Sequence, residues 1–271
     1  GCARAILPAK NNDGSRQDRT MNDTLIAPYV HSPDAIELDA HHPVCDWSDN
    51  LAQNITRGLR FLADTFFAKR YGNRAIVLET VAAVPGMVGA AMVHLRCLRW
   101  MRHDRGWIRA LMEEAENERM HLMTFIEIAR PSRLERALVL VAQAGFFTFF
   151  LLLYLLSPRT AHRLVGYFEE QAVISYSQYL QEIDAGRVEN VPAPRIAIDY
   201  WRLPADARLR EVVLAVRADE AGHRDVNHGF ADELRPAGII AAKTTAGSAI
   251  RFPQSEKPRV AGLFRGGHAD P

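Results

Sequence analysis

Two segments of the chain carry a Glu-x-x-His pattern, Glu118 to His121 and Glu220 to His223. In a helix this spacing places both side chains on one face. A single pair of this kind is weak, because helices are rich in glutamate and most isolated pairs lie on solvated faces. Two pairs on two long helical segments indicate metal binding more strongly than either pair alone.

A four-helix di-metal carboxylate site needs one further carboxylate from each of two other helices. Glu79 is one candidate, since it is the only charged residue between Arg74 and His94 and a lone carboxylate among apolar residues is costly unless it is paired or binds an ion. A carboxylate near the start of its helix is the plainer explanation for Glu79 taken alone. The pair Glu169 and Glu170 supplies the other candidate. A donor set of carboxylates with only two imidazoles suits iron or manganese better than zinc or copper.

The elements that must carry these residues read as helices. The 39 residues from 79 to 118 and the 51 residues from 169 to 220 each leave room for two helices of ~25 residues and a turn. Apolar periodicity and proline or glycine stops predict helices over 51–70, 73–102, 105–129, 132–156, 160–185 and 205–234. Strand-like alternation is scarce, so we expect an all-α fold, a ferritin-like four-helix di-iron bundle with additional apolar helices.

Three parts of the chain differ in composition. Residues 1–50 read as a loose N-terminal arm, of which 1–20 would be upstream sequence if Met21 is the native start. Residues 51–235 form the bundle domain, and residues 236–271 read as a disordered tail. The near balance of 33 Lys+Arg against 32 Asp+Glu argues against nucleic acid as a partner, and the absence of a CxxC pair excludes a thiolate zinc site. His41 and His42 have metal-binding side chains, but we expect a loop there.

Residues 137–156 contain no charge and are long enough to cross a bilayer. A single crossing would place Glu118 and Glu169 on opposite sides, where they could not share a metal site. We therefore expect segments 51–70 and 137–156 to lie in the membrane interface, as in a monotopic protein. The alternative is a soluble protein that buries this segment in its own core or in a dimer. A di-metal site at a membrane surface would suit a lipid-soluble quinol that delivers electrons to dioxygen.

Four motifs resemble the signature motifs of the alternative oxidases over roughly residues 50–235. They are LET (Leu78 to Thr80), NERMHL (Asn117 to Leu122), LVGYFEEQAVISY (Leu164 to Tyr176) and RADEAGHRDVNH (Arg217 to His228). The resemblance implies a cyanide-insensitive ubiquinol:oxygen oxidoreductase, a respiratory-chain enzyme that reduces dioxygen to water at a non-haem di-iron centre of two iron ions without proton pumping. It also implies an interfacial membrane mode and a homodimer.

The resemblance assigns roles residue by residue. The metal ligands it implies are Glu79, Glu118, His121, Glu169, Glu220 and His223, with Glu118 and Glu220 bridging the irons. Tyr176 would be the redox-active tyrosine, although by itself it would read as a core residue. The supporting residues behind the ligands would be Asn117, His162, Trp201 and Asp219. The quinol pocket would use Arg60, Asp64, Arg74, Leu78, Ala172 and Ser175.

The chain departs from the family pattern at three positions. Gln171 stands where the family usually has a third consecutive glutamate, beside the pocket and not at a ligand position. Ser175 replaces a usual threonine and keeps the hydroxyl group. Asn73 occupies the place of a regulatory cysteine in plant members, which puts thiol-linked activation in doubt.

Other functions remain open at this stage. A demethoxyubiquinone hydroxylase-like enzyme would share the ligand pattern and the membrane mode, whereas the LET and NERMHL motifs and Tyr176 favour the oxidase. A ferritin-like iron-storage protein would not need the apolar segment 137–156, and a metal-free anchored scaffold would leave Glu79 unexplained. The excess of arginine over lysine favours the cytoplasmic face of a bacterial inner membrane; the matrix face of a mitochondrial inner membrane is the alternative.

Overall fold

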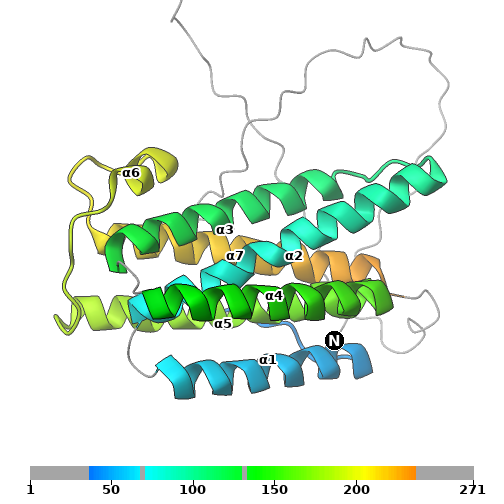
Figure 1. Cartoon of the computed structure of the whole chain (residues 1–271), viewed down its shortest axis with the longest axis horizontal. Coiled ribbons are helices and arrows are strands. Elements are labelled where there is room, and N and C mark those ends of the chain that lie inside the picture. Colours follow the sequence, from blue (N-terminus) through cyan, green and yellow to red (C-terminus); the bar gives the residue numbers. More distant parts are fainter. Residues whose placement is uncertain (1–36, 68–70, 130–132, 236–271) are drawn as a thin grey trace, which may run out of the picture.

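The computed structural model describes residues 37–67, 71–129 and 133–235. Within these ranges it describes the backbone alone at residues 66–67, 71–74, 77, 133–136 and 138. The described part contains seven helices and no strand, with one isolated β-bridge between Pro192 and Arg208. The fold is all-α, as the sequence predicts (Figure 1).

Six of the helices match the six predicted segments, with ends that differ by at most four residues. They are α1 (Trp47–Phe67), α2 (Tyr71–Trp100), α3 (Trp107–Ala129), α4 (Arg133–Leu156), α5 (Pro158–Asp184) and α7 (Leu209–Glu233). The short α6 (Arg195–Trp201) is an addition that the periodicity does not predict, because seven residues hold less than two full turns of apolar pattern.

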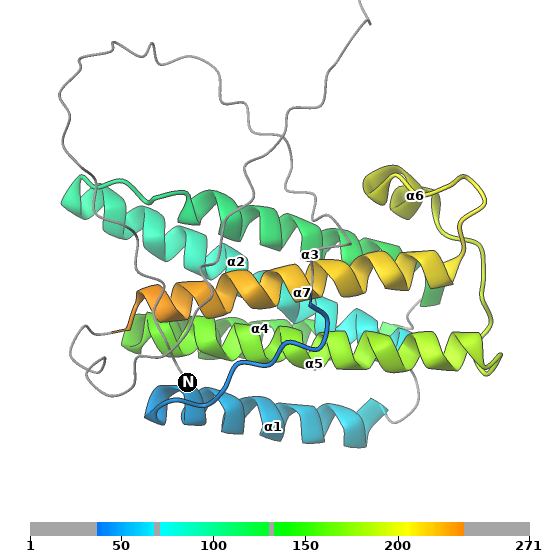
Figure 2. The same ribbon diagram turned by 180° about the vertical axis from the view of Figure 1, so that it is seen from behind.

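Helices α2, α3, α5 and α7 form the bundle that carries the four predicted carboxylate positions. The most extensive packing joins α2 to α3 and α5 to α7. Helix α1 lies along α5, and α4 packs against α2 and α5 (Figures 1 and 2). The bundle therefore has two close helix pairs, with α1 and α4 as additional helices on its outside.

Two glycines allow the close helix pairs. A Cβ atom at Gly86 of α2 would lie 2.4 Å from the carbonyl oxygen of Leu111 on α3. A Cβ atom at Gly166 of α5 would lie 2.5 Å from the imidazole ring of His228 on α7. A larger residue would have to push the α3 backbone away at Gly86 and displace the His228 ring at Gly166. Small residues at such crossings set the distance between side chains that project into the bundle.

Helix α4 is apolar and largely exposed. The stretches Val139–Leu156 and Leu78–Trp100 are, by length and composition only, long and apolar enough to cross a membrane, and in the first only 11% of the residues are buried. The α4 side chains that face outward include Leu140, Val141, Phe147, Phe149, Leu152, Leu155 and Leu156, and Leu59, Phe61 and Leu62 are exposed on α1. Burial of α4 inside the core of a single chain is therefore excluded.

The boundary between the predicted arm and the bundle domain differs from the structure. Helix α1 begins at Trp47, inside the predicted 1–50 arm, and residues 37–46 lie against the bundle (Figure 2). The segment is held by contacts with Arg224 and Glu170, which lie far from it in the sequence, so local patterns do not predict its position. Residues 1–36 of the predicted arm and the predicted tail 236–271 lie outside the described residues.

Candidate metal centre

The structure brings all six predicted metal ligands together in the middle of the bundle. Each of the four bundle helices contributes, and every ligand is buried: Glu79 on α2, Glu118 and His121 on α3, Glu169 on α5, Glu220 and His223 on α7. The local reason is helical spacing, which turns both members of each Glu-x-x-His pair to the inner face.

The ligand atoms form two groups that share two residues. In the first group, one ligand atom from each of Glu79, Glu118, His121 and Glu220 lies within 4.8 Å of the others. In the second group the same holds for Glu118, Glu169, Glu220 and His223. Because Glu118 and Glu220 belong to both groups, the arrangement suits two ions bridged by these two carboxylates.

The histidines face the carboxylates with the same ring atom. The Nδ1 atom of His121 lies 3.3 Å from Glu118 Oε2 and 3.4 Å from both Glu79 Oε2 and Glu220 Oε1. The Nδ1 atom of His223 lies 2.7 Å from Glu118 Oε1 and 4.0 Å from Glu220 Oε2. Each imidazole is thus within reach of an ion held by the carboxylates.

Among the described residues, several of these buried atoms lie close to one another without the geometry of a hydrogen bond. They are Glu79 Oε2, both carboxylate oxygens of Glu118, His121 Nδ1 and His223 Nδ1. Leaving one buried polar group unsatisfied costs about 1–3 kcal/mol, so such a convergence is expensive unless cations complete it. Four carboxylates and two imidazoles fit iron or manganese by donor chemistry. The residues present therefore fit a di-iron centre.

The pKa values of the clustered carboxyl groups also indicate that positive charge is needed beside them. Burial and the nearby Glu118 carboxylate raise the pKa of Glu79 and of Glu220 to about 8. Burial and Glu220 hold the pKa of Glu169 well above its usual range. The pKa of Glu118 is lowered because its contacts with His121 and His223 outweigh its burial. The bundle interior cannot hold all these carboxylate charges without protons or cations to balance them.

Tyr176 on α5 is buried beside this cluster. Its hydroxyl donates a hydrogen bond to Glu79 Oε1, and its ring stacks on Phe125 with centroids 5.8 Å apart. Burial, together with the negative charge of Glu79, raises the pKa of Tyr176 well above its usual range. The phenol therefore keeps its proton and presents it to a candidate ligand.

Asp219 contacts two of the predicted supporting residues and one predicted ligand. Its Oδ2 atom accepts hydrogen bonds from Asn117 Nδ2 at 2.9 Å and from Trp201 Nε1 at 2.7 Å. It also lies 3.3 Å from Nε2 of His121. A carboxylate at that nitrogen orients the ring so that Nδ1 faces the cluster. The unpredicted helix α6 is what delivers Trp201, whose indole stacks on His121 with centroids 5.7 Å apart.

His162, a predicted supporting residue, forms its hydrogen bonds with residues that are not candidate metal ligands. Its Nδ1 atom lies 3.0 Å from Asn227 Oδ1, and its Nε2 atom lies 3.1 Å from the hydroxyl of Tyr154. Asn227 in turn donates to Glu114 Oε2 at 2.8 Å. Sequence reasoning missed Glu114 and Asn227. A signal was available, because the two lie one helical turn from the ligands, four residues before Glu118 and four after His223.

A cavity of about 160 Å³ lies between α1, α2 and α5 and reaches the cluster. Its wall includes the ligands Glu79, Glu169 and Glu220 together with Tyr176. Four of the six predicted quinol residues line it: Arg60, Leu78, Ala172 and Ser175. Thr56, Leu59, Phe168 and Tyr179 line it as well, and the sequence reasoning did not single them out.

The other two predicted pocket residues differ in status. Asp64 does not line the cavity but pairs with Arg60, with 3.3 Å between Oδ2 and Nε. The side chain of Arg74 lies outside the described part of the structure. Gln171 lines the cavity, and its Oε1 atom accepts a hydrogen bond from Arg60 Nη1. Arg60 is thus held between a carboxylate and a neutral amide.

Comparison with known proteins matches residues 33–232 to the family model described as "Alternative oxidase". The chain is 56% identical over 208 residues to "Alternative oxidase 3, mitochondrial" of Glycine max, covering 77% of this chain and 64% of that protein. It is 56% identical over 212 residues to "Ubiquinol oxidase 1a, mitochondrial" of Oryza sativa subsp. japonica, covering 78% and 64%. It is 58% identical over 203 residues to "Ubiquinol oxidase 1a, mitochondrial" of Arabidopsis thaliana, covering 75% and 57%. The chain thus spans about three fifths of the length of these curated relatives.

Proposed function

The chain belongs to the alternative oxidase family, and from that premise we propose that it is a ubiquinol:oxygen oxidoreductase. It oxidises ubiquinol and reduces dioxygen to water, is insensitive to cyanide and pumps no protons. The observation that carries this proposal is the pair of ligand groups that share Glu118 and Glu220, directly beside a cavity. The names of the relatives, alternative oxidase and ubiquinol oxidase, support the same activity.

The proposed cofactor is a pair of iron ions held by Glu79, Glu118, His121, Glu169, Glu220 and His223. When bound, the iron supplies the redox chemistry by which four electrons from two ubiquinols reduce one dioxygen to two waters. Glu118 and Glu220 would be shared by the two ions, since they alone belong to both ligand groups. Asp219 fixes the ring of His121 for this task.

The cavity between α1, α2 and α5 is the proposed quinol site. Leu59, Leu78 and Phe168 provide apolar surface, while Arg60 and Ser175 offer hydrogen-bonding groups to a quinol head group. Electrons have a short route from this site because Glu79 and Glu169 are part of its wall. We assign to Tyr176 the role of holding and delivering a proton and an electron next to Glu79, in keeping with its hydroxyl contact there.

The proposed setting is the surface of an inner membrane. The exposed apolar side chains of α1 and α4 support an interfacial position with both helices in the lipid boundary. The enzyme then faces the matrix if it is mitochondrial, as the names of the relatives suggest, and the cytoplasm if it is bacterial. A homodimer is the proposed assembly, by resemblance to the family.

The test is oxygen uptake by the detergent-purified, iron-loaded protein with a short-chain ubiquinol, in the presence and absence of cyanide. We expect uptake that cyanide does not inhibit, with two quinols oxidised per dioxygen. Lack of quinol-dependent uptake by iron-loaded protein would contradict the proposal. A hydroxylated quinone as the product would instead identify the related quinone-modifying hydroxylase.

A further inference from the structure

Residues 37–46 cross the outer faces of α5 and α7 before α1 begins (Figure 2). We call these ten residues the strap. They form no helix, and they contact buried side chains of α5 and α7. The strap is of interest because of where on the two helices it is attached.

On α5 the strap is attached at Glu170, the residue directly after the candidate ligand Glu169. The side chain of Glu170 is 4% exposed, and both of its oxygens are occupied. Oε2 contacts Nδ1 of His41. Oε1 accepts from the backbone N–H of His42 at 2.8 Å and lies 3.0 Å from Nε2 of His228 on α7. A buried carboxylate is thus stabilised by two groups of the strap and one of the neighbouring helix.

The ring of His228 has a defined role in this contact. Arg163 Nη1 lies 2.8 Å from His228 Nδ1, and a guanidinium can only donate. The Nδ1 atom is therefore an acceptor, and the ring proton sits on Nε2, from which it is donated to Glu170. Both ring nitrogens of His228 are engaged, so this ring joins α5 to α7 and has no nitrogen left for a metal ion.

On α7 the strap is attached at Arg224, the residue directly after the candidate ligand His223. The guanidinium of Arg224 donates to three strap carbonyl groups, those of Glu37 at 2.7 Å and of Leu38 and Ala40 at 3.2 Å. The side chain is 1% exposed. Charge-assisted bonds of this kind are about twice as strong as neutral ones.

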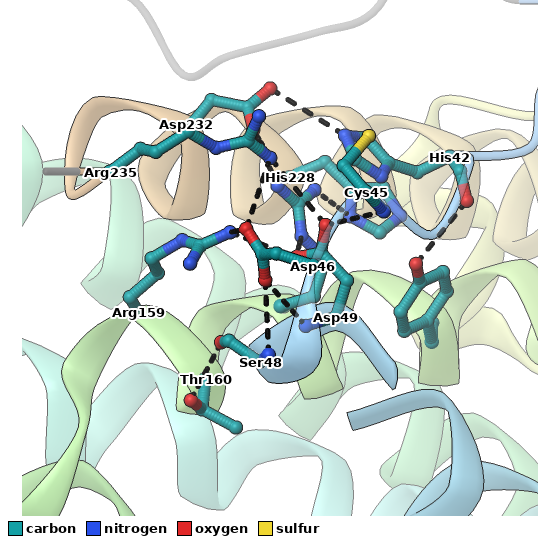
Figure 3. A network of polar contacts seen from close by, with 12 residues as sticks. His42, Cys45, Asp46, Ser48, Asp49, Arg159, Thr160, His228, Asp232 and Arg235 are labelled. Atoms are coloured by element: carbon teal, nitrogen blue, oxygen red, sulfur yellow. Dashed lines mark hydrogen bonds and ion pairs between the residues drawn. The ribbon is translucent and has the colours of Figure 1, made fainter. Parts of the chain in front are cut away.

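The end of the strap is anchored by an ionic network at the start of α1 (Figure 3). Arg159 contacts Asp46 and Asp49, and Arg163 Nε donates to Asp49 Oδ1 at 2.9 Å. His42 adds a contact of 3.6 Å between its Nε2 atom and Oδ2 of Asp232 on α7. The strap is therefore fixed at its last residues and attached to both helices along its length.

From this arrangement we propose that the strap is a brace that sets the rotation of α5 and α7 about their axes, with His41, Glu170 and Arg224 as positioning residues for the metal centre. Successive residues of a helix project about 100° apart. Glu170 and Arg224 directly follow Glu169 and His223, so fixing the direction of the first two side chains also fixes the direction of the two candidate ligands. This proposal rests on the proposed function in one respect, that the cluster of glutamates and histidines is the iron site.

The test compares iron release to a chelator from full-length, iron-loaded wild-type protein, Glu170→Ala and Glu170→Gln. We expect about tenfold faster release from Glu170→Ala, by analogy with the effect of removing groups behind metal ligands. Glu170→Gln keeps an oxygen that can accept from His42 and His228 and should restore release to within a few-fold of wild type. Gln181→Ala, an exposed change on the same helix, is the matched control and should release iron at the wild-type rate.

Wild-type release from a folded Glu170→Ala protein would overturn the proposal. If that variant does not fold, His41→Ala serves in its place, because the His41 side chain is 57% exposed and its loss removes one bond to Glu170. Several-fold faster release is expected from His41→Ala, and release at the wild-type rate would overturn the proposal. Iron release is read without turnover, so a failure of the proposed oxidase activity would be recognised separately.

Discussion

The hydroxyl of Tyr176 on α5 donates a hydrogen bond to Oε1 of Glu79 on α2. This bond joins two residues that lie 97 positions apart in the sequence. Both side chains also line the cavity. This contact joins the proposed quinol site to the proposed metal site through a group that keeps its proton, because burial raises the pKa of Tyr176.

Replacement of Tyr176 by phenylalanine tests that contact. Tyr176→Phe removes the proton donor and leaves the ring that stacks on Phe125 in place. We expect iron content close to wild type and quinol oxidase turnover reduced more than about tenfold, since a positioned proton donor typically contributes 10²–10⁴-fold. Iron analysis and oxygen uptake on the same preparation measure the two quantities. Normal turnover would rule out the proposed role of the hydroxyl.

Removal of a shared ligand should abolish the metal centre. Glu118 belongs to both ligand groups, so Glu118→Ala should reduce the iron content from about two ions per chain to near zero and eliminate oxygen uptake. Glu116→Ala is the control on the same helix, because Glu116 is exposed and pairs with Arg119. Full iron loading of Glu118→Ala would refute the ligand assignment.

Replacement of Asp219, which contacts a candidate ligand, should weaken iron binding less than the loss of a ligand does. Asp219→Asn removes the negative charge that His121 Nε2 faces, and it leaves an oxygen that can still accept from Trp201. Iron affinity or turnover should fall by about 10–100-fold, the usual effect of losing a group that orients a ligand. Chelator competition measures the affinity, with the exposed Asp206→Asn as the control. An affinity equal to that of wild type would show that His121 is oriented by other contacts.

The contribution of His162 to the stability of the fold should decrease as the pH falls from about 6.5 toward 4. Burial lowers the pKa of His162 to about 4, so in this range the unfolded chain binds a proton that the folded chain does not, and protonation favours unfolding. At pH 5 the loss from this group is about 2 kcal/mol. Burial also lowers the pKa of His228 to about 4, so its contribution to stability depends on pH in the same direction.

Thermal unfolding between pH 7 and pH 5 measures this dependence. His162→Gln cannot be protonated in either state, so its melting temperature should rise relative to that of wild type as the pH falls from 7 to 5. His103→Gln, an exposed change, should leave the slope as it is. Equal slopes for wild type and His162→Gln would mean that His162 is not kept neutral by the fold.

The exposed face of α4 makes a prediction about lipid. Leu152 is 54% exposed, and a charge placed in the lipid boundary is costly. Leu152→Glu should lower the fraction of protein that sediments with liposomes several-fold while leaving the helical content unchanged. Met112→Glu on α3 is the matched control, since Met112 is 50% exposed. Unchanged sedimentation of Leu152→Glu would place the membrane surface elsewhere.

Much of the helical fold could be predicted because its cause is local. Apolar periodicity and the stops at proline and glycine located six helices to within four residues at each end. The strap and α6 could not be found in this way. The strap is held by Glu170 and Arg224, which lie far from it in the sequence. Helix α6 is too short to show a period, although it supplies the Trp201 contact to Asp219.

Residue types and spacing alone predicted the kind of site, with Glu79, two Glu-x-x-His pairs and one of Glu169 and Glu170 in a fixed order on four helices. They could do so because the rotation from one residue to the next in a helix is constant. Only the tertiary structure decided that Asn117, Trp201 and His121 meet at Asp219, and that His162 bonds to Asn227. Distances between helices depend on how closely they cross, and here Gly86 and Gly166 allow a close approach that no spacing within one helix can report.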